Sequence, residues 1–215
     1  MPSVPAMRAA ALTLLIAALA AAGTSLADPA EDVAAAALAA WPGMPGLREV
    51  SRIAGTCGAD KRVSPSAAYC TTTGEVLITP AARAAPDAAY RTAHQMGHAA
   101  QVTQGVADRV RAAIRRAPSD EPALRARLET QADCLAGVIA VRAGHPASPG
   151  ELFDAEPFAG PHWGSDPLRS GPEVAIGLRA RDEAFARGAA AGHPRACADP
   201  ELDGGRLESG WRLGG

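Results

Sequence analysis

The chain has 215 residues, of which 47% are hydrophobic and 20% charged, a balance that predicts one globular domain able to bury a core. Its formal net charge is −2 and no basic run is interleaved with aromatic residues, which argues against nucleic-acid binding. Aromatic residues make up only 4% whereas alanine is abundant, so we expect a helix-rich core of small side chains.

The N-terminal segment has the pattern of a secretory signal peptide. Arg8 is followed by an apolar stretch over residues 9–22 and by a small-x-small cleavage pattern at residues 25–27. The alternative is a membrane anchor, but the apolar stretch is shorter than the roughly 20 residues that a helix needs to cross a bilayer. We therefore expect cleavage after Ala27 and a secreted protein, outside the cell or in the cell envelope. An uncleaved segment would instead tether the protein to a membrane.

The first elements after this segment are a helix and a short strand. Asp28 is a suitable N-cap with proline directly after it, and the helix that follows should run to Trp41. Residues 43–73 are rich in Gly, Pro, Ser and Thr, which predicts a loop with short extended pieces. Residues 75–79 have the β-branched and apolar character of a strand.

Four more helices are expected, at residues 87–105, 106–117, 119–144 and 172–190. Asp87 can cap the first of them, and residues 145–170 form a loop-rich stretch before the last. The final eighteen residues look frayed. We therefore predict a helix-rich α+β domain with a small sheet over residues 28–200, followed by a tail over residues 201–215.

The helix at residues 87–105 carries the most informative motif, His-Gln-Met-Gly-His at residues 94–98. Histidines at i and i+4 share one face of a helix, the arrangement by which the H-E-x-x-H signature binds Zn²⁺. Glu129 and Asp133 lie one turn apart on the later helix, as a third ligand and a carboxylate that orients a histidine would. Gly97 would let another element approach closely between the ligands.

Each part of this pattern also has a simpler interpretation. An H-x-x-x-H sequence often occurs by chance without binding a metal, and Glu129 with Asp133 could be a solvated helix face. The four cysteines allow three disulfide connectivities, among which the sequence alone does not choose. The nested pairing of Cys57 with Cys70 and of Cys134 with Cys197 is the most economical, and Cys134 as a zinc ligand is its rival.

Several segments together resemble the bacterial neutral zinc metallopeptidase family. The family carries H-E-x-G-H and E-L-Q-A-D-C-L-A-G-V, where this chain has HQMGH at residues 94–98 and ETQADCLAGV at residues 129–138. Residues 56–78 are similar to its C-G…F-Y-C…V-Y-I block, and residues 185–197 to its W-F…G…C ending. The resemblance covers roughly residues 30 to 200.

The resemblance implies a zincin-like α+β fold with Zn²⁺ held by His94, His98 and Glu129, and with Asp133 behind them. It also implies the two disulfides Cys57–Cys70 and Cys134–Cys197. The family's H-G-[ST] segment has an inserted residue here, at residues 162–165. A remote histidine or tyrosine often steadies the oxyanion in zincins, so His162 or Tyr90 is a candidate for that role.

The chain departs from the family at the residue expected to be the general base, which here is Gln95. A carboxamide oxygen is too weakly basic to take a proton from water and pass it to a departing amine. The resulting hypothesis is an exported, zinc-binding pseudopeptidase. One alternative is an active hydrolase that uses zinc hydroxide or another carboxylate, such as Glu75 or Glu121. A second alternative is a non-catalytic interaction module with an empty metal site.

The expected partner is a peptide or protein ligand. If the fold is a zincin, an extended peptide would add to an edge of the sheet that contains residues 76–78.

Overall fold

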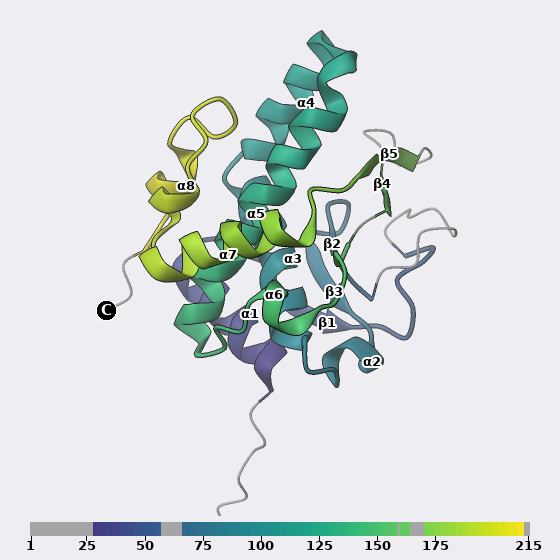
Figure 1. Ribbon diagram of the computed structural model, residues 1–215, viewed down its shortest axis with the longest axis vertical. Helices are drawn as coiled ribbons and strands as arrows, with labels where there is room; N and C mark the ends of the chain where they lie inside the picture. Colours follow the sequence, from purple (N-terminus) through teal and green to yellow (C-terminus); the bar gives the residue numbers. More distant parts are fainter. Residues whose placement is uncertain (1–27, 57–65, 159, 164–169, 213–215) are drawn as a thin grey trace, which may run out of the picture.

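The computed structural model describes residues 28–56, 66–158, 160–163 and 170–212 (Figure 1). The helices are α1 (Pro29–Ala40), α2 (Pro80–Arg83), α3 (Ala88–Thr103), α4 (Val106–Arg116), α5 (Glu121–Ala143), α6 (Pro149–Leu152), α7 (Leu178–Ala191) and α8 (Arg206–Ser209), with 3₁₀ turns η1 (Pro118–Asp120) and η2 (Pro194–Cys197). The strands are β1 (Leu47–Glu49), β2 (Ala67–Cys70), β3 (Glu75–Ile78), β4 (Gly160–Trp163) and β5 (Ser170–Val174).

The predicted helix-rich α+β fold with a small sheet is confirmed. The central layer consists of α1, α3, α5 and α7, whose apolar faces form the main core around Trp41, Met96, Leu135 and Phe185. Two other clusters of buried side chains cover the faces of the sheet. Figure 1 shows α7 crossing α5 and the sheet lying to the side of α3.

The main sheet has three strands in the order β1-β3-β2. β3 is the central strand, parallel to β1 and antiparallel to β2, with Tyr69 of β2 opposite Val76 of β3. β2 is the edge strand that packs against α3, and all four of its residues are buried. The sheet therefore presents β2 toward the helix that carries the histidine motif. β4 and β5 form a separate antiparallel pair.

Local signals set several helix ends as the sequence indicates. The Asp28 carboxylate accepts hydrogen bonds from the backbone N–H groups of Ala30 and Glu31, so it caps α1. Gly144 ends α5 in the left-handed conformation (φ 80°), in which glycine has no Cβ penalty. Asp87 occupies the N-cap position of α3, as predicted, but does not act as a side-chain cap. Its carboxylate makes no capping hydrogen bond and instead accepts from Arg91, one turn further along the helix.

The last helix and the C-terminal segment also differ from the prediction. α7 begins at Leu178 rather than near residue 172, because residues 170–174 pair with β4 as strand β5. The final segment is not frayed over the residues that the structure describes, since Leu202, Asp203 and Leu207 are each 1% exposed. The indole N–H of Trp41 donates to the Leu207 carbonyl (3.1 Å), which ties this segment to α1.

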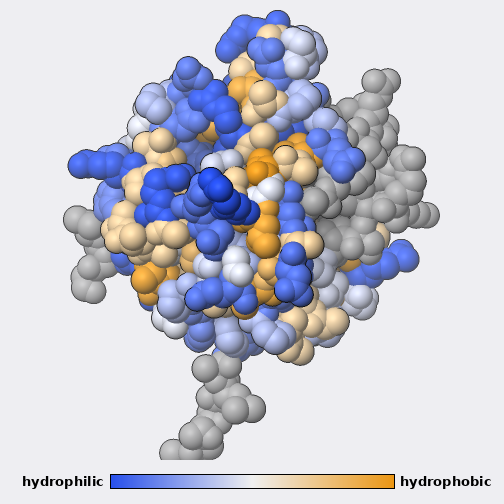
Figure 2. Space-filling view, viewed as in Figure 1, coloured by the Kyte–Doolittle hydropathy of each residue, from blue (hydrophilic) through white to orange (hydrophobic). Residues whose placement is uncertain are grey.

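The predicted signal peptide and the predicted Cys57–Cys70 disulfide both involve residues that the structure does not describe. Residues 1–27 and Cys57 lie outside the described residues. Cys134 and Cys197 form a disulfide between α5 and η2, so Cys134 offers no thiolate to a metal. Within the described ranges, no helix combines the length and the apolar character needed to span a bilayer. On the face seen in Figure 2, hydrophobic residues form small patches between hydrophilic ones.

Candidate metal centre

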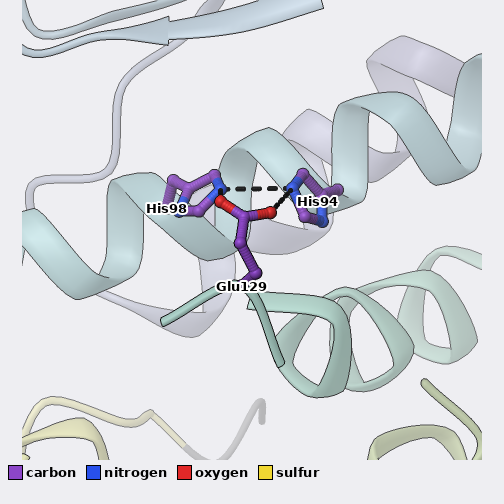
Figure 3. Close-up of side chains that lie close together, drawn as sticks. All are labelled: His94, His98 and Glu129. Carbon is purple, nitrogen blue, oxygen red and sulfur yellow. Dashed lines mark hydrogen bonds and ion pairs between the residues drawn. The ribbon is translucent and has the colours of Figure 1, made fainter. Parts of the chain in front are cut away.

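α3 and α5 bring His94, His98 and Glu129 together, as Figure 3 shows. The Nε2 atoms of the two histidines are 3.1 Å apart. One oxygen of Glu129 lies 3.3 Å from Nε2 of His94, and the other lies 3.3 Å from Nε2 of His98. The side chains of His94 and Glu129 are 1% and 4% exposed, whereas that of His98 is 23% exposed. Solvent therefore reaches the cluster from the side of His98.

The other nitrogen of each ring is held by an acceptor. Nδ1 of His94 lies 2.7 Å from Asp133 Oδ1, and a carboxylate can only accept. Nδ1 of His98 lies 3.0 Å from Gln101 Oε1, and the amide of Gln101 is oriented because its Nε2 donates to the Leu128 carbonyl. Both rings therefore carry hydrogen on Nδ1. Both Nε2 atoms face Glu129, the orientation in which a histidine binds a metal while its other nitrogen donates to an acceptor.

The donor set fits a zinc ion. Zn–N and Zn–O bonds of roughly 2.0–2.1 Å place tetrahedral ligands about 3.3 Å from one another. The two Nε2 atoms, 3.1 Å apart, match that spacing, and each of them lies 3.3 Å from one of the two oxygens of Glu129. Three lone-pair donors this close would repel one another without a cation between them. Two imidazoles and one carboxylate are also the protein ligands of known catalytic zinc sites.

A proton can replace the cation in the metal-free protein. Burial disfavours the charged form of His94, but Asp133 and Glu129 favour it by more, so the pKa of His94 is raised to about 9. A protonated His94 would donate to both carboxylates. Because a metal must displace this proton, its affinity should increase as the pH rises toward 9.

Asp133 lies at the centre of a buried hydrogen-bond network behind the cluster. Its Oδ1 accepts from the hydroxyl of Tyr90 (2.7 Å), and its Oδ2 accepts from NH1 of Arg181 (2.8 Å). Burial and the charge of Asp133 raise the pKa of Tyr90 well above its usual value. Tyr90 is 1% exposed, so its hydroxyl holds Asp133 in place and is not available to steady an oxyanion.

Arg181 belongs to the site although no sequence motif points to it. It comes from α7 and is fully buried. Its guanidinium donates to Asp133, to Glu129 (3.4 Å) and, through Nε, to Glu156 (2.9 Å). The only signal in the sequence is an arginine four residues before Phe185 on an otherwise amphipathic helix, a common pattern. Arg181 partly offsets the charge of Glu129 and of its neighbour Asp133.

Gln95 connects α3, the helix that carries the two histidines, to the sheet. It is 7% exposed, and its Oε1 accepts from the backbone N–H of Tyr69 in β2 (2.8 Å). Gln95 therefore occupies the position between β2 and the histidine pair, with an amide where the H-E-x-x-H signature has a carboxylate.

The other candidates are placed as follows. Glu75 pairs with Arg48, and Glu121 with Arg125, so each carboxylate is held by an arginine. His162 lies in β4, and the role of its side chain stays a prediction. Gly97 allows the close approach expected of it, because a Cβ there would lie 2.7 Å from the Ala132 carbonyl oxygen of α5.

Comparison with known proteins agrees with this geometry. Residues 54–156 match the model of the family described as "Putative neutral zinc metallopeptidase". This range contains His94, His98 and Glu129. Comparisons with curated proteins and with solved structures gave no match. The resemblance seen in the motifs is thus confirmed over residues 54–156, the range that contains the His-His-Glu cluster.

Proposed function

We propose that this protein is an exported zinc-binding protein of the neutral zinc metallopeptidase family whose peptidase turnover is impaired. The observation that carries this proposal is the contrast between the His-His-Glu cluster and Gln95, the residue next to His94. The two histidines and Glu129 retain the arrangement of a zinc site, while Gln95 supplies an amide at the position of the general base.

His94, His98 and Glu129 would hold the zinc. When bound, zinc lowers the pKa of a coordinated water to about 7 and polarises a carbonyl group. A carboxylate at position 95 would take a proton from water and return it to the leaving amine. Gln95 can hydrogen-bond water but cannot carry that proton. Because an amine leaves poorly unless it is protonated, peptide bonds should be affected more than esters.

The neighbouring carboxylates do not replace the missing base. Glu129 is a ligand in this arrangement, and Asp133 accepts from His94, Tyr90 and Arg181. Glu156 accepts from the Arg181 side chain and from the backbone N–H of Ile176. These hydrogen bonds occupy the acceptor oxygens and restrict the movement of each side chain.

The substitution Gln95→Glu tests the proposal. A carboxylate oxygen can accept the same N–H from Tyr69, so the variant should keep the fold. We expect about one zinc per chain in both proteins by elemental analysis. Peptide cleavage should be about 10²–10⁴-fold faster in the variant. Ester cleavage should change less, because an alkoxide leaves more readily than an unprotonated amine and depends less on a proton from residue 95.

Gln104→Glu, at the end of the same helix, is the matched control and should leave both rates unchanged. Equal peptide cleavage by Gln95→Glu and the unaltered chain would contradict the loss of a base at this position. It would favour a hydrolase that uses another group. Well under one zinc per chain would favour the interaction module with an empty site.

Export is supported by the signal-peptide pattern of residues 1–27 and by the Cys134–Cys197 disulfide, a bond that persists in oxidising compartments. N-terminal sequencing of the exported protein tests it, and Asp28 should be the first residue. The peptide ligand remains part of the proposal. The edge strand β2, through which Tyr69 contacts Gln95, is the edge that would present a peptide to the metal centre.

A further inference from the structure

A chain of buried side-chain amides runs from the ligand His98 to the C-terminal segment. Gln101 Oε1 faces Nδ1 of His98, and Gln101 Nε2 donates to Gln131 Oε1 (3.1 Å). Gln131 Nε2 in turn donates to Asp203 Oδ2 (2.9 Å) and to the Cys197 carbonyl (3.1 Å). The chain thus connects α3, α5 and the segment after η2.

The direction of the hydrogen bonds in this chain is determined by fixed acceptors, the Asp203 carboxylate at the far end and the Leu128 carbonyl beside Gln101. The Asp203 carboxylate can only accept, so the NH₂ group of Gln131 must face it and Oε1 must face Gln101. The same reasoning places Oε1 of Gln101 toward His98 and makes the histidine the donor. Gln101, Gln131 and Asp203 are 2%, 3% and 1% exposed, so water does not compete for these bonds.

The two histidines are therefore supported differently. His94 contacts the carboxylate of Asp133 directly, whereas the acceptor of His98 is a neutral amide. Hydrogen bonds in a low-dielectric interior polarise one another along a chain. A carboxylate at the far end makes Gln101 Oε1 a stronger acceptor and His98 Nε2 a stronger metal ligand.

We propose that Asp203 is a positioning residue of the metal centre, which acts on His98 through Gln131 and Gln101. This inference rests on the proposed zinc binding and goes beyond the His-His-Glu cluster. It makes the C-terminal segment a functional part of the site. Asp203 is itself held by the backbone N–H groups of Asp199 and Gly205 (both 2.7 Å), so its carboxylate keeps a constant position.

The test compares Asp203→Asn with Asp199→Asn in the full chain. Both substitutions remove one negative charge from the same segment, but the Asp199 carboxylate pairs with Arg127 and not with the amide chain. Zinc affinity is measured by competition with a chromophoric chelator. We expect Asp203→Asn to weaken zinc binding roughly threefold to tenfold. This is below the roughly 10–100-fold loss that is typical when a residue bonded directly to a metal ligand is replaced. We expect Asp199→Asn to change it less than twofold.

A second variant separates positioning from general destabilisation. Gln131→Met keeps a similar volume but removes the amide. It should reproduce the loss of affinity, and the double variant Gln131→Met/Asp203→Asn should be no weaker than Gln131→Met alone. Additive losses, or equal losses in Asp203→Asn and Asp199→Asn, would overturn the proposal.

The ¹⁵N NMR spectrum of labelled histidine in the metal-free protein gives a readout that does not depend on zinc. It should show His98 with hydrogen on Nδ1 in the unaltered chain. In Gln131→Met the Leu128 carbonyl still orients Gln101, so His98 should keep this tautomer, but its Nδ1 resonance should shift toward that of a weaker hydrogen bond. If the unaltered chain bound no zinc, the proposed function would fail, and these spectra would still decide whether the amide chain acts on His98. An unchanged Nδ1 resonance in both Gln131→Met and Asp203→Asn would contradict that role.

Discussion

At the scale of single residues, Arg181 has the largest influence on the charge of the site. Its side chain is fully buried and bonds Glu129, Asp133 and Glu156. With one guanidinium among three carboxylates, the metal-free cluster keeps an excess of negative charge, which a divalent cation would neutralise. The arginine therefore stabilises the fold without zinc and at the same time weakens the attraction for zinc.

Replacing this residue should separate the two effects. We expect Arg181→Met to lower the free energy of unfolding of the metal-free protein by about 3–5 kcal/mol, because it leaves buried carboxylates without their partner. Saturating zinc should recover more stability in the variant than in the unaltered chain. Urea unfolding with and without zinc measures both.

Arg179→Met is the matched control for this prediction. Arg179 precedes Arg181 by two residues on α7, on the opposite side of the helix. Its side chain is 91% exposed, and within the described part of the chain it pairs only with Glu183. Its replacement should change the free energy of unfolding by no more than about 0.5 kcal/mol. If zinc stabilised Arg181→Met no more than the unaltered chain, the charge argument would be wrong.

At the scale of elements, the site depends on how closely α3 and α5 approach. Gly97 lies between the two histidines, and the backbone of Ala132 lies against it, between Glu129 and Asp133 in α5. The ligands from the two helices meet because no side chain separates the backbones at this point. A second glycine allows an equally close approach of α5 and α7. A Cβ on Gly188 would collide with the Cys134 carbonyl oxygen.

Gly97→Ala tests this contact. In an isolated helix, alanine is favoured over glycine by about 1 kcal/mol. Here the added Cβ would push α5 away from α3, and overpacking of this kind typically costs about 1–3 kcal/mol. We expect a net loss of stability in urea unfolding, together with weaker zinc binding. A variant more stable than the unaltered chain would show that the two backbones are not in contact.

At the scale of the whole molecule, the C-terminal segment closes the fold over α1 and α5. The Cys134–Cys197 disulfide joins residues 63 positions apart in the sequence. Beyond it, Trp211 packs edge-on against Trp41 with ring centroids 4.7 Å apart, and the Arg142 guanidinium lies over the Trp211 ring. The segment that carries Asp203 is thus held at both ends.

Removing the Cys134–Cys197 disulfide should lower the free energy of unfolding. By the chain-entropy argument, a crosslink over a loop of this length stabilises the folded state by about 4 kcal/mol. We expect Cys134→Ala/Cys197→Ala to lose stability of that order in urea unfolding. Its zinc affinity should also fall, because Gln131 donates to the Cys197 carbonyl. A loss below about 1 kcal/mol would mean that the packing of Leu202, Leu207 and Trp211 closes the fold without the crosslink.

Much of the site could be predicted from the sequence, because the signals are local. The i, i+4 spacing places His94 and His98 on one face of a helix whatever the helix packs against. Gly97 permits a close neighbour, and Asp28 determines where α1 begins through contacts within three residues. The family motif around Glu129 then supplied the second half of the site.

Only the tertiary structure decided which distant groups meet these residues. Arg181 and Asp203 have no local pattern, since their roles depend on surfaces of α5, α7 and the C-terminal segment that become neighbours on folding. Gln101 lies one turn from His98 on α3, but its hydrogen bonds to α5 also form only on folding. For the same reason, the C-terminal segment looks frayed by composition, but Leu202 and Leu207 are buried and the Leu207 carbonyl accepts from Trp41. Spacing along the chain therefore determined the ligands, whereas long-range packing determined the groups that orient them, because a hydrogen bond between distant segments depends on their position in space.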